Sequence, residues 1–249
     1  HQSGCKSWLL ARLACTAGHN SQTARKALAN RLLMCTNMGM CNLYNITTSQ
    51  AAIRDLTGAS RDLFGNLQEN LNFYPDYPAP IVRHGSDGVR ELVSARWGMP
   101  TPPKFVKGSA NSGVTNIRNV TSPHWRRWLG VENRCVVPAT SFSEYGSVRD
   151  PETKKLPLFW FGLSESKPLF FMAGIWTGWH GVRKVKEGPQ DHEIFGFLTC
   201  EPNSVVAPIH QKAMPVILRD KDEIETWLSA PSSEALTLQR PLPDDALVV

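Results

Sequence analysis

The chain has 249 residues, of which 41% are hydrophobic and 20% are charged, which is ordinary for a globular protein that buries a substantial core. No apolar run approaches the roughly 20 residues of a membrane span, so no membrane partner is expected. The net charge of +5 is uneven, because residues 1–39 hold five Lys or Arg and no acid, leaving 22 basic against 22 acidic residues in 40–249. Only a local basic patch could therefore support binding to nucleic acid.

The six cysteines are scattered, and no two of them form a Cys-x-x-Cys pair. Zinc sites usually contain such pairs, so no metal site is predicted, and no organic cofactor is expected. Isolated cysteines are typical of the reduced thiols of an intracellular protein rather than of a disulfide framework.

Residues 1–39 differ from the rest of the chain, since they lack acids and carry a helical pattern over 21–34. That composition overlaps with a mitochondrial transit peptide. The sequence starts with His1, and Met34, Met38 and Met40 offer later starts. We interpret 1–39 as upstream sequence or a misplaced start and expect no mitochondrial targeting, with a transit peptide or a structural segment as the alternatives. Residues 40–249 are predicted to form one domain.

From residue 40 onward, short apolar runs alternate with turn residues. The predicted strands cover 40–48, 81–83, 89–97, 114–118, 134–138, 141–145, 157–161, 169–176, 193–199 and 214–218. Helices are predicted over 51–56, over 122–129, and over 222–229 with Asp220 or Asp222 as the cap. Many short strands with few helices between them predict a single compact α+β domain.

Proline and glycine mark the predicted connections. Pro75, Pro78 and Pro80 exclude a helix and force an extended, turning path. The turn at 86–88 makes a hairpin of 81–83 and 89–97. Residues 98–113 are predicted to form a loop, and the tail from 230 a surface wrap.

Cys41 directly follows Met40. Removal of Met40 would leave Cys41 with an amine and a thiol on neighbouring carbons, a pair suited to capturing an aldehyde. Their reference pKa values of about 7.7–8.0 and about 8.5 make both nucleophiles accessible near neutral pH. The alternative is an ordinary buried cysteine at the start of a strand.

Two predicted strands carry polar groups in a suggestive pattern. Asn116 and Arg118 fall on one face of theirs, where an amide could orient a carbonyl and a guanidinium could hold a phosphate. Glu144 shares a face with Phe142, and a carboxyl group in apolar surroundings can act as a general acid or base. For Asn116 and Arg118 the alternative is that they cap a loop. For Glu144 the alternative is that its strand face is exposed.

His210 lies in a turn between Pro208 and Pro215. A histidine on such a turn can shuttle protons near neutral pH. A histidine that only bonds to local backbone is the alternative.

Cations and aromatic side chains alternate at three places, which is typical of surfaces that bind single-stranded nucleic acid. The candidates are Trp97 after Arg96, Arg126 between Trp125 and Trp128, and the pair Arg183 and Lys184 in the segment 179–186. For Trp125 and Trp128 the alternative is packing of one helix face.

In combination, several motifs resemble the SOS response-associated peptidase (SRAP) family. The resemblance covers residues 40 to about 242. It rests on Met40-Cys41, the segment 75–80, Ala95-Arg96-Trp97-Gly98-Met99, Thr115-Asn116-Ile117-Arg118, Ser141-Phe142-Ser143-Glu144-Tyr145, and Ile209-His210 followed by 214–218.

The resemblance implies a mostly antiparallel, barrel-like core flanked by helices, and a sensor that cross-links to abasic sites in single-stranded DNA during the DNA damage response. It implies that Cys41 is the catalytic N-terminal residue and that Asn116, Glu144 and His210 complete the site. Arg118 and Trp97 match DNA-contacting positions.

The chain departs from the family pattern after Cys41, where Asn42 and Leu43 replace a glycine and an arginine. The protein implied is a cytoplasmic monomer that joins the nucleoid when bound to DNA, with DNA lyase activity as a companion. Two rivals stay open, namely a cysteine-dependent peptidase that cleaves itself to expose Cys41, and a DNA-binding module without enzymatic activity.

Overall fold

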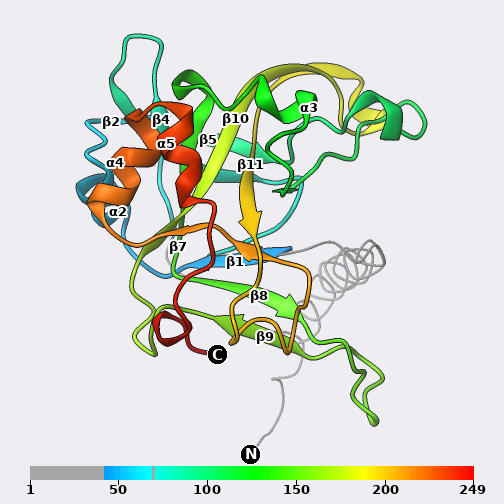
Figure 1. Cartoon of the computed structure of the whole chain (residues 1–249). Helices are drawn as coiled ribbons and strands as arrows, with labels where there is room; N and C mark the ends of the chain where they lie inside the picture. Colours follow the sequence, from blue (N-terminus) through cyan, green and yellow to red (C-terminus); the bar gives the residue numbers. More distant parts are fainter. Residues whose placement is uncertain (1–41, 69–70) are drawn as a thin grey trace, which may run out of the picture. The chain divides into compact units, whose positions relative to one another are not determined.

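The chain builds its core almost entirely from strands, as Figure 1 shows for a computed structural model that describes residues 42–68 and 71–249. The strands are β1 (Leu43–Ile46), β2 (Arg61–Asp62), β3 (Leu71–Phe73), β4 (Pro78–His84), β5 (Arg90–Trp97), β6 (Asn116–Ile117), β7 (Arg134–Ala139), β8 (Ser141–Tyr145), β9 (Leu158–Phe161), β10 (Phe170–Val182), β11 (Pro189–Cys200), β12 (Met214–Pro215) and β13 (Ile217–Leu218). The predicted features of residues 1–39 and Cys41 lie outside the described residues.

Helical segments are short and connect or flank the strands. The α-helices are α2 (Gln50–Thr57), α3 (Pro123–Arg126), α4 (Lys221–Ser229) and α5 (Ser232–Ala235). Single 3₁₀ turns are η2 (Pro103–Phe105), η3 (Val131–Asn133), η4 (Val185–Glu187), η5 (Leu236–Leu238) and η6 (Asp244–Ala246). In the described part of the chain, none of these helices is long and apolar enough to cross a membrane.

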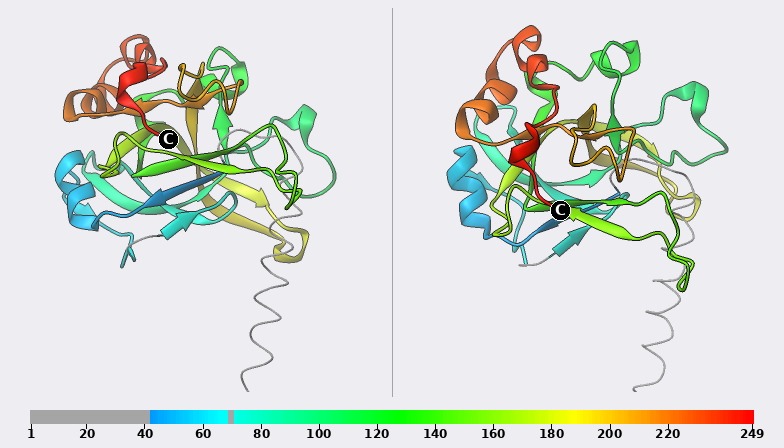
Figure 2. Two further views of the ribbon diagram at one scale, coloured as in Figure 1. Left: turned by 90° about the horizontal axis from the view of Figure 1, so that it is seen from below. Right: turned by 60° about the horizontal axis from the view of Figure 1, so that its bottom comes forward.

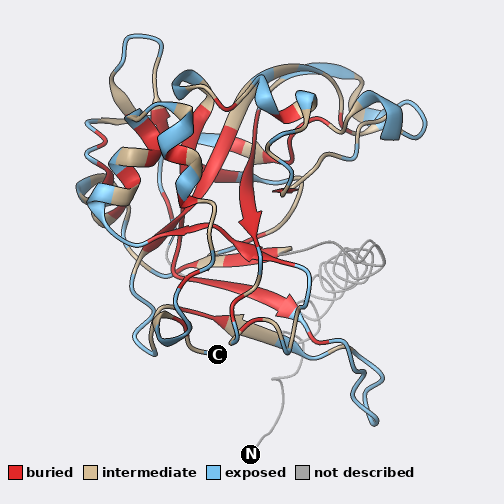
Figure 3. Ribbon diagram, viewed as in Figure 1, coloured by how far each residue is buried: buried red, intermediate tan, exposed pale blue. Residues whose placement is uncertain are grey.

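A barrel forms the centre of the domain. Its strands run in the order β11-β10-β7-β4-β5, each antiparallel to the next, and β5 closes the circle by pairing in parallel with β11. Figure 3 shows that these strands are buried where they form the barrel, while the outer halves of β10 and β11 are partly exposed. The predicted α+β class with a mostly antiparallel, barrel-like core is confirmed.

A second sheet, in the order β3-β1-β8-β9, packs against the barrel. The ring of Tyr44 in β1 joins the two sheets, since it stacks on Phe73 and meets Trp97 of β5 edge-on, both at 5.2 Å between ring centroids. Aromatic pairs in these geometries stabilise beyond the area that they bury. Tyr44 thereby fixes where β1, and with it the start of the domain, lies on the barrel.

Helices cover two sides of the barrel. Figures 1 and 2 show α2 and α4 on one flank, and α3 with the loop 98–113 on the other. In α4, Asp220 accepts a hydrogen bond from the amide of Glu223 at 2.9 Å, so it is the N-cap. Trp227 of α4 is fully buried and donates its indole N–H to the carbonyl of Cys135 at 2.8 Å, which anchors the helix on β7.

The structure differs from the predictions mainly between 176 and 193. Strands β10 and β11 continue well beyond the predicted 169–176 and 193–199 and form a long ribbon. Trp179 stacks on His192, and His180 bonds to Asp191 across the strands. These cross-strand pairs stabilise the ribbon. Its sequence is polar and contains glycines, so it did not predict strands there. Helix α3 is also shorter than the predicted 122–129.

Candidate active site and nucleic-acid interface

The start of the domain lies beside a buried carboxylate. Cys41 itself lies outside the described residues. Its neighbour Asn42 leads into β1, which pairs with β8 so that Leu43 faces Ser143, and the Ser143 hydroxyl donates to the Leu43 carbonyl at 3.1 Å. Continuing this antiparallel register by one residue brings Asn42 opposite Glu144. The register therefore directs Asn42, the residue that follows Cys41, toward Glu144.

Glu144 is 4% exposed, and residues 141–144 of β8 are all buried. The prediction that Glu144 shares a buried environment with Phe142 is confirmed, and Phe142 stacks on Phe161 at 5.0 Å. The alternative of an exposed strand face is wrong. A carboxyl group in such surroundings is costly to bury unless it is hydrogen-bonded or paired.

Asn116 is buried at the first position of β6, and its side-chain amide donates to the Thr115 hydroxyl at 2.8 Å. Strand β6 runs parallel to β11, with Asn116 next to Phe197. The Phe197 ring in turn lies 6.4 Å from the ring of Tyr44 in β1. Phe197 therefore pairs with Asn116 along the backbone and contacts Tyr44 of β1 through its ring.

Arg118 joins this region to the loop that carries His210. Its guanidinium donates to the Glu201 carboxylate and, at 3.3 Å, to the carbonyl of Lys212. The pair with Glu201 is solvent-accessible, with 35% and 73% of the two side chains exposed. Arg118 is therefore placed where a phosphate could compete with Glu201 for the guanidinium.

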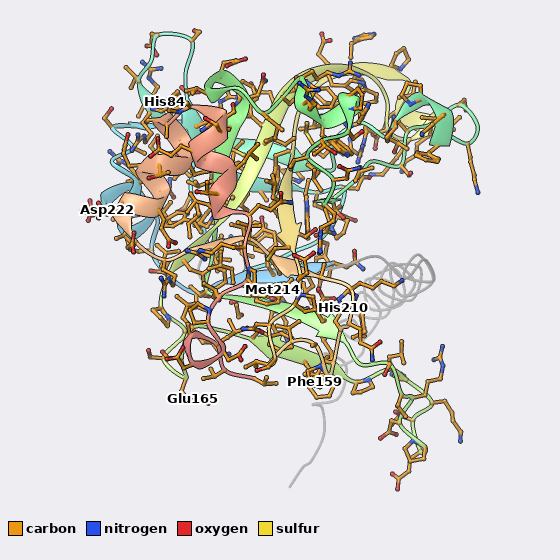
Figure 4. The ribbon with its side chains drawn as sticks, in the orientation of Figure 1. His84, Phe159, Glu165, His210, Met214 and Asp222 are labelled. Carbon is orange, nitrogen blue, oxygen red and sulfur yellow. The ribbon has the colours of Figure 1, made fainter. Side chains whose placement is uncertain are left out.

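His210 is half-buried, and its Nδ1 lies 3.0 Å from the carbonyl oxygen of Ala213. A carbonyl only accepts, so Nδ1 carries the hydrogen, which makes Nε2 the ring atom that can take up a proton. His210 therefore forms the bond to local backbone that was predicted as the alternative. That bond uses Nδ1 only, so Nε2 is available for proton transfer. Figure 4 shows His210 on the segment before Met214, which in this view lies near the end of β8.

Trp97, predicted as a DNA-contacting residue, is enclosed in the core. Its side chain is fully buried, its ring packs against Tyr44, and its indole N–H donates to the carbonyl of Thr115 at 3.2 Å. A ring enclosed in this way has no face on which a base could stack. Its role is to hold Thr115, the residue before Asn116.

Arg183, predicted as a DNA-binding residue, is enclosed as well. Its side chain is 1% exposed and bonds to Asp76 at 2.8 Å and to the carbonyl of Gly98 at 3.1 Å. Lys184 is 41% exposed, but Asp76 and Glu187 lie 3.2 and 3.3 Å from its ammonium group. Acidic neighbours thus offset much of the positive charge predicted for 179–186.

The surface around α3 is a better candidate for contact with nucleic acid. Arg126 is exposed as predicted, whereas Trp125 is buried, which supports the alternative of helix packing for that residue. The sequence reasoning missed Lys104 and Phe105, whose ring is 61% exposed with the Lys104 ammonium 4.8 Å away. A lysine next to a phenylalanine in a polar loop could have indicated this candidate from the sequence. We call Arg126 and Arg127 the α3 surface, and Lys104 with Phe105 forms a separate exposed cation–aromatic pair in the loop 98–113.

The described cysteines are poor nucleophiles. Cys135 and Cys200 are buried free thiols, and burial raises the pKa of Cys200 to about 12 and that of Cys135 still further. A thiol is nucleophilic only as a thiolate. Within 42–68 and 71–249, no group of three His, Cys, Asp or Glu side chains is arranged to hold a metal ion.

The sequence and the fold were compared with known proteins. The family model described as SOS response associated peptidase (SRAP) matches residues 40–249. Among curated relatives, the abasic site processing protein YoqW of Bacillus subtilis (strain 168) is 32% identical over 167 residues, which is 64% of this chain and 66% of that protein. The abasic site processing protein YoaM of the same organism is 31% identical over 187 residues, or 70% of this chain and 72% of that protein.

Solved structures share the fold. A protein from Bordetella bronchiseptica superimposes with a TM-score of 0.62 at 22% identity, covering 84% of this chain and 97% of that protein. A protein from Bacteroides thetaiotaomicron gives the same TM-score and identity, covering 84% and 90%. The family match covers all of the residues that the structure describes. The chain therefore belongs to the SOS response associated peptidase (SRAP) family.

Proposed function

We propose that this protein senses abasic sites in single-stranded DNA and forms a covalent cross-link to them through Cys41 as an N-terminal residue. The SRAP match and two relatives named abasic site processing proteins support a role at abasic sites in DNA damage. The observation that carries the chemistry is the buried carboxyl group of Glu144, which lies opposite Asn42 when the β1–β8 register is continued.

The proposed reaction starts from the open-chain aldehyde of the abasic sugar. The Cys41 amine adds to the aldehyde carbon to give a carbinolamine, which loses water to give an imine. The Cys41 thiolate then adds to the imine carbon, the nitrogen takes up a proton, and a five-membered thiazolidine forms. Ring closure is effectively unimolecular, which favours it strongly over a bimolecular step. The net change is loss of one water molecule.

The remaining site residues receive distinct roles in this proposal. Glu144 protonates the departing hydroxyl of the carbinolamine and moves protons during opening of the sugar. His210 exchanges a proton through Nε2, and the Asn116 amide orients the reacting sugar. Arg118 holds a phosphate once DNA has displaced Glu201, and the α3 surface contacts the flanking strand.

The deciding experiment uses protein that begins at Cys41, mixed with abasic and intact single-stranded oligonucleotides and resolved on a denaturing gel. We expect a heat-stable adduct with abasic DNA only. Cys41→Ala should lose it, and Cys41→Ser should leave at most a labile imine that borohydride traps. A Cys41→Ala protein that cross-links like the parent would refute the proposal.

Glu144→Gln tests the acid–base role. We expect slower cross-linking, by roughly a hundredfold for the loss of a general acid, with unchanged binding of an intact oligonucleotide. The matched control is Glu193→Gln, which changes a carboxylate that is 46% exposed on β11. Equal rates for Glu144→Gln and the parent would rule out proton transfer by Glu144.

The peptidase alternative rests on the residues that precede Cys41 in this sequence. Protein that starts at residue 1 has no free Cys41 amine. If the site cleaves its own chain before Cys41, this protein should shorten on incubation and then gain cross-linking activity, whereas Cys41→Ala should stay intact. Reversible binding without either change would instead support a DNA-binding module.

A further inference from the structure

Arg183 ties together three segments that are distant in the sequence. Its Nε and Nη2 donate to Oδ1 of Asp76 at 3.0 and 2.8 Å. Its Nη1 donates to the carbonyl of Gly98 at 3.1 Å, and Nη2 also reaches the carbonyl of Ser112 at 3.4 Å. Gly98 and Ser112 stand at the two ends of the loop 98–113, so one guanidinium grips both ends.

The contact at both ends is close enough to require glycine. Gly98 and Gly113 have φ angles of 142° and 79°, a region that side chains disfavour. A Cβ atom would lie 2.6 Å from the guanidinium at Gly98 and 2.3 Å from it at Gly113. The loop backbone thus lies directly against the Arg183 guanidinium at both of its ends.

A continuous set of hydrogen bonds leads from this contact to Asn116. Beyond Gly113, Val114 exchanges two backbone hydrogen bonds with Met99, at 2.7 and 2.9 Å. The next carbonyl, that of Thr115, accepts from the Trp97 indole at 3.2 Å and from the backbone N–H of Phe197 at 3.3 Å. Asn116 follows at once, and its strand β6 is only two residues long.

Asp76, which accepts the hydrogen bonds of Arg183, has an unusual backbone conformation. Asp76 has a φ of 68°, and its amide donates to the Trp97 carbonyl at 2.8 Å. It also accepts from Arg96 at 2.8 and 2.9 Å. Aspartate tolerates positive φ better than most residues, and backbone strain persists where surrounding contacts require it. The turn at Asp76 thus serves as a fixed acceptor for Arg183.

We propose that Arg183 is a positioning residue for the cross-linking reaction: it locks both ends of the loop 98–113 and so sets the Asn116 amide against the abasic sugar. This inference rests on the proposed function of the Cys41 site. Strand β6 pairs with β11 over only two residues, Asn116 and Ile117, and the locked loop adds a second constraint on the chain that enters it. A displacement of about 1 Å at a reacting group can cost roughly a hundredfold in rate.

The first test replaces Arg183 by Met and by Lys and measures single-turnover cross-linking at saturating abasic oligonucleotide. We expect Arg183→Met to slow the reaction by about tenfold or more. Arg183→Lys should fall between, since an ammonium group cannot grip two loop ends at once. Binding of an intact oligonucleotide should not change, because the buried side chain does not reach DNA.

The matched control is Arg83→Met. Arg83 is also a buried arginine with acidic partners, Glu91 at 3.0 Å and Glu193 at 2.8 Å, but it contacts neither end of the loop. It should lower stability without slowing cross-linking at a temperature where the protein is folded. Gly113→Ala disturbs the same lock from the loop side and should slow the reaction as Arg183→Met does.

A double-mutant cycle separates positioning from general stability. If Arg183 acts through Asn116, Arg183→Met should slow cross-linking in the parent but have little further effect in Asn116→Ala, while its loss of stability persists in both. Equal slowing in both backgrounds, or a folded Arg183→Met that reacts like the parent, overturns the inference. Failure of the parent itself to cross-link would instead refute the proposed function.

Discussion

Asp76 is the residue whose removal should most disturb the buried charges near the site. Asp76→Asn keeps the size of the side chain and removes its negative charge. In the folded protein Asp76 accepts from Arg96 and Arg183, and Lys184 lies 3.2 Å away. The substitution leaves the Arg183 guanidinium, with a side chain that is 1% exposed, without its anionic partner.

The magnitude follows from the burial of that pair. Breaking one partner of a buried ion pair costs about 3–5 kcal/mol. Asp76 is 27% exposed, and Arg183 retains the Gly98 carbonyl as an acceptor, so the lower end, about 3 kcal/mol, applies. With a urea dependence of about 3 kcal/mol per molar, the unfolding midpoint should fall by about 1 M.

Urea unfolding of the two proteins at pH 7 measures this change. Asp87→Asn is the matched control, because Asp87 pairs with Arg61 at a site where both side chains are over one-third exposed, and exposed pairs contribute little. The control midpoint should barely move. A midpoint for Asp76→Asn no lower than that of Asp87→Asn would refute the reasoning.

The same variant predicts a dependence on pH. Although burial opposes it, hydrogen bonds from Arg96 and Arg183 hold the pKa of Asp76 below its ordinary value. A carboxyl group with a depressed folded-state pKa stabilises above its unfolded pKa of about 3.9, and this stabilisation is lost as the pH falls through the folded pKa. The difference in unfolding free energy between the parent and Asp76→Asn should therefore shrink below about pH 4.

Three further predictions concern DNA binding. Trp97→Phe should bind an intact single-stranded oligonucleotide like the parent. Trp97→Ala should lower the unfolding free energy by about 3–5 kcal/mol. If Trp97→Phe is fully stable but binds the oligonucleotide more weakly, Trp97 contacts DNA directly. Arg118→Gln should weaken binding and reduce the slope of log affinity against log salt by about 0.7, and an unchanged slope would exclude a phosphate contact. Glu201→Gln should tighten binding by up to about fivefold. Unaltered affinity in a titration of labelled oligonucleotide would show that Glu201 does not compete for Arg118.

Local sequence patterns predicted the secondary structure well where a single local pattern, such as alternation or a capping residue, determines the element. Alternation placed Phe142 and Glu144 on a buried strand, and an acid before an apolar period predicted a cap at Asp220 or Asp222, of which the structure has Asp220. The ends of β10 and β11 were missed because cross-strand pairs such as Trp179 with His192 hold them. Such pairs are visible only once the register of the strands is known.

The candidate site residues show the same difference between local and long-range signals. Residue type and motif pointed to Asn116, Glu144 and His210 as candidates. In the structure the Tyr44 ring of β1 contacts Phe197, which pairs with Asn116, and Arg118 donates to Lys212 in the loop of His210. Side-chain chemistry could not tell that Trp97 and Arg183 are enclosed. An arginine beside an aromatic has the same sequence pattern whether it meets a phosphate or a buried aspartate.

By itself, the sequence determined the fold class, most strand positions and the polar groups suited to aldehyde chemistry, because these depend on periodicity and on residue type. Only the tertiary structure decided which cations are available to DNA and which are consumed inside the protein. The reason is that burial arises from contacts between distant segments: Arg183 meets Asp76 across 107 positions of the chain. That contact turns a predicted DNA ligand into a support for the loop that leads to Asn116.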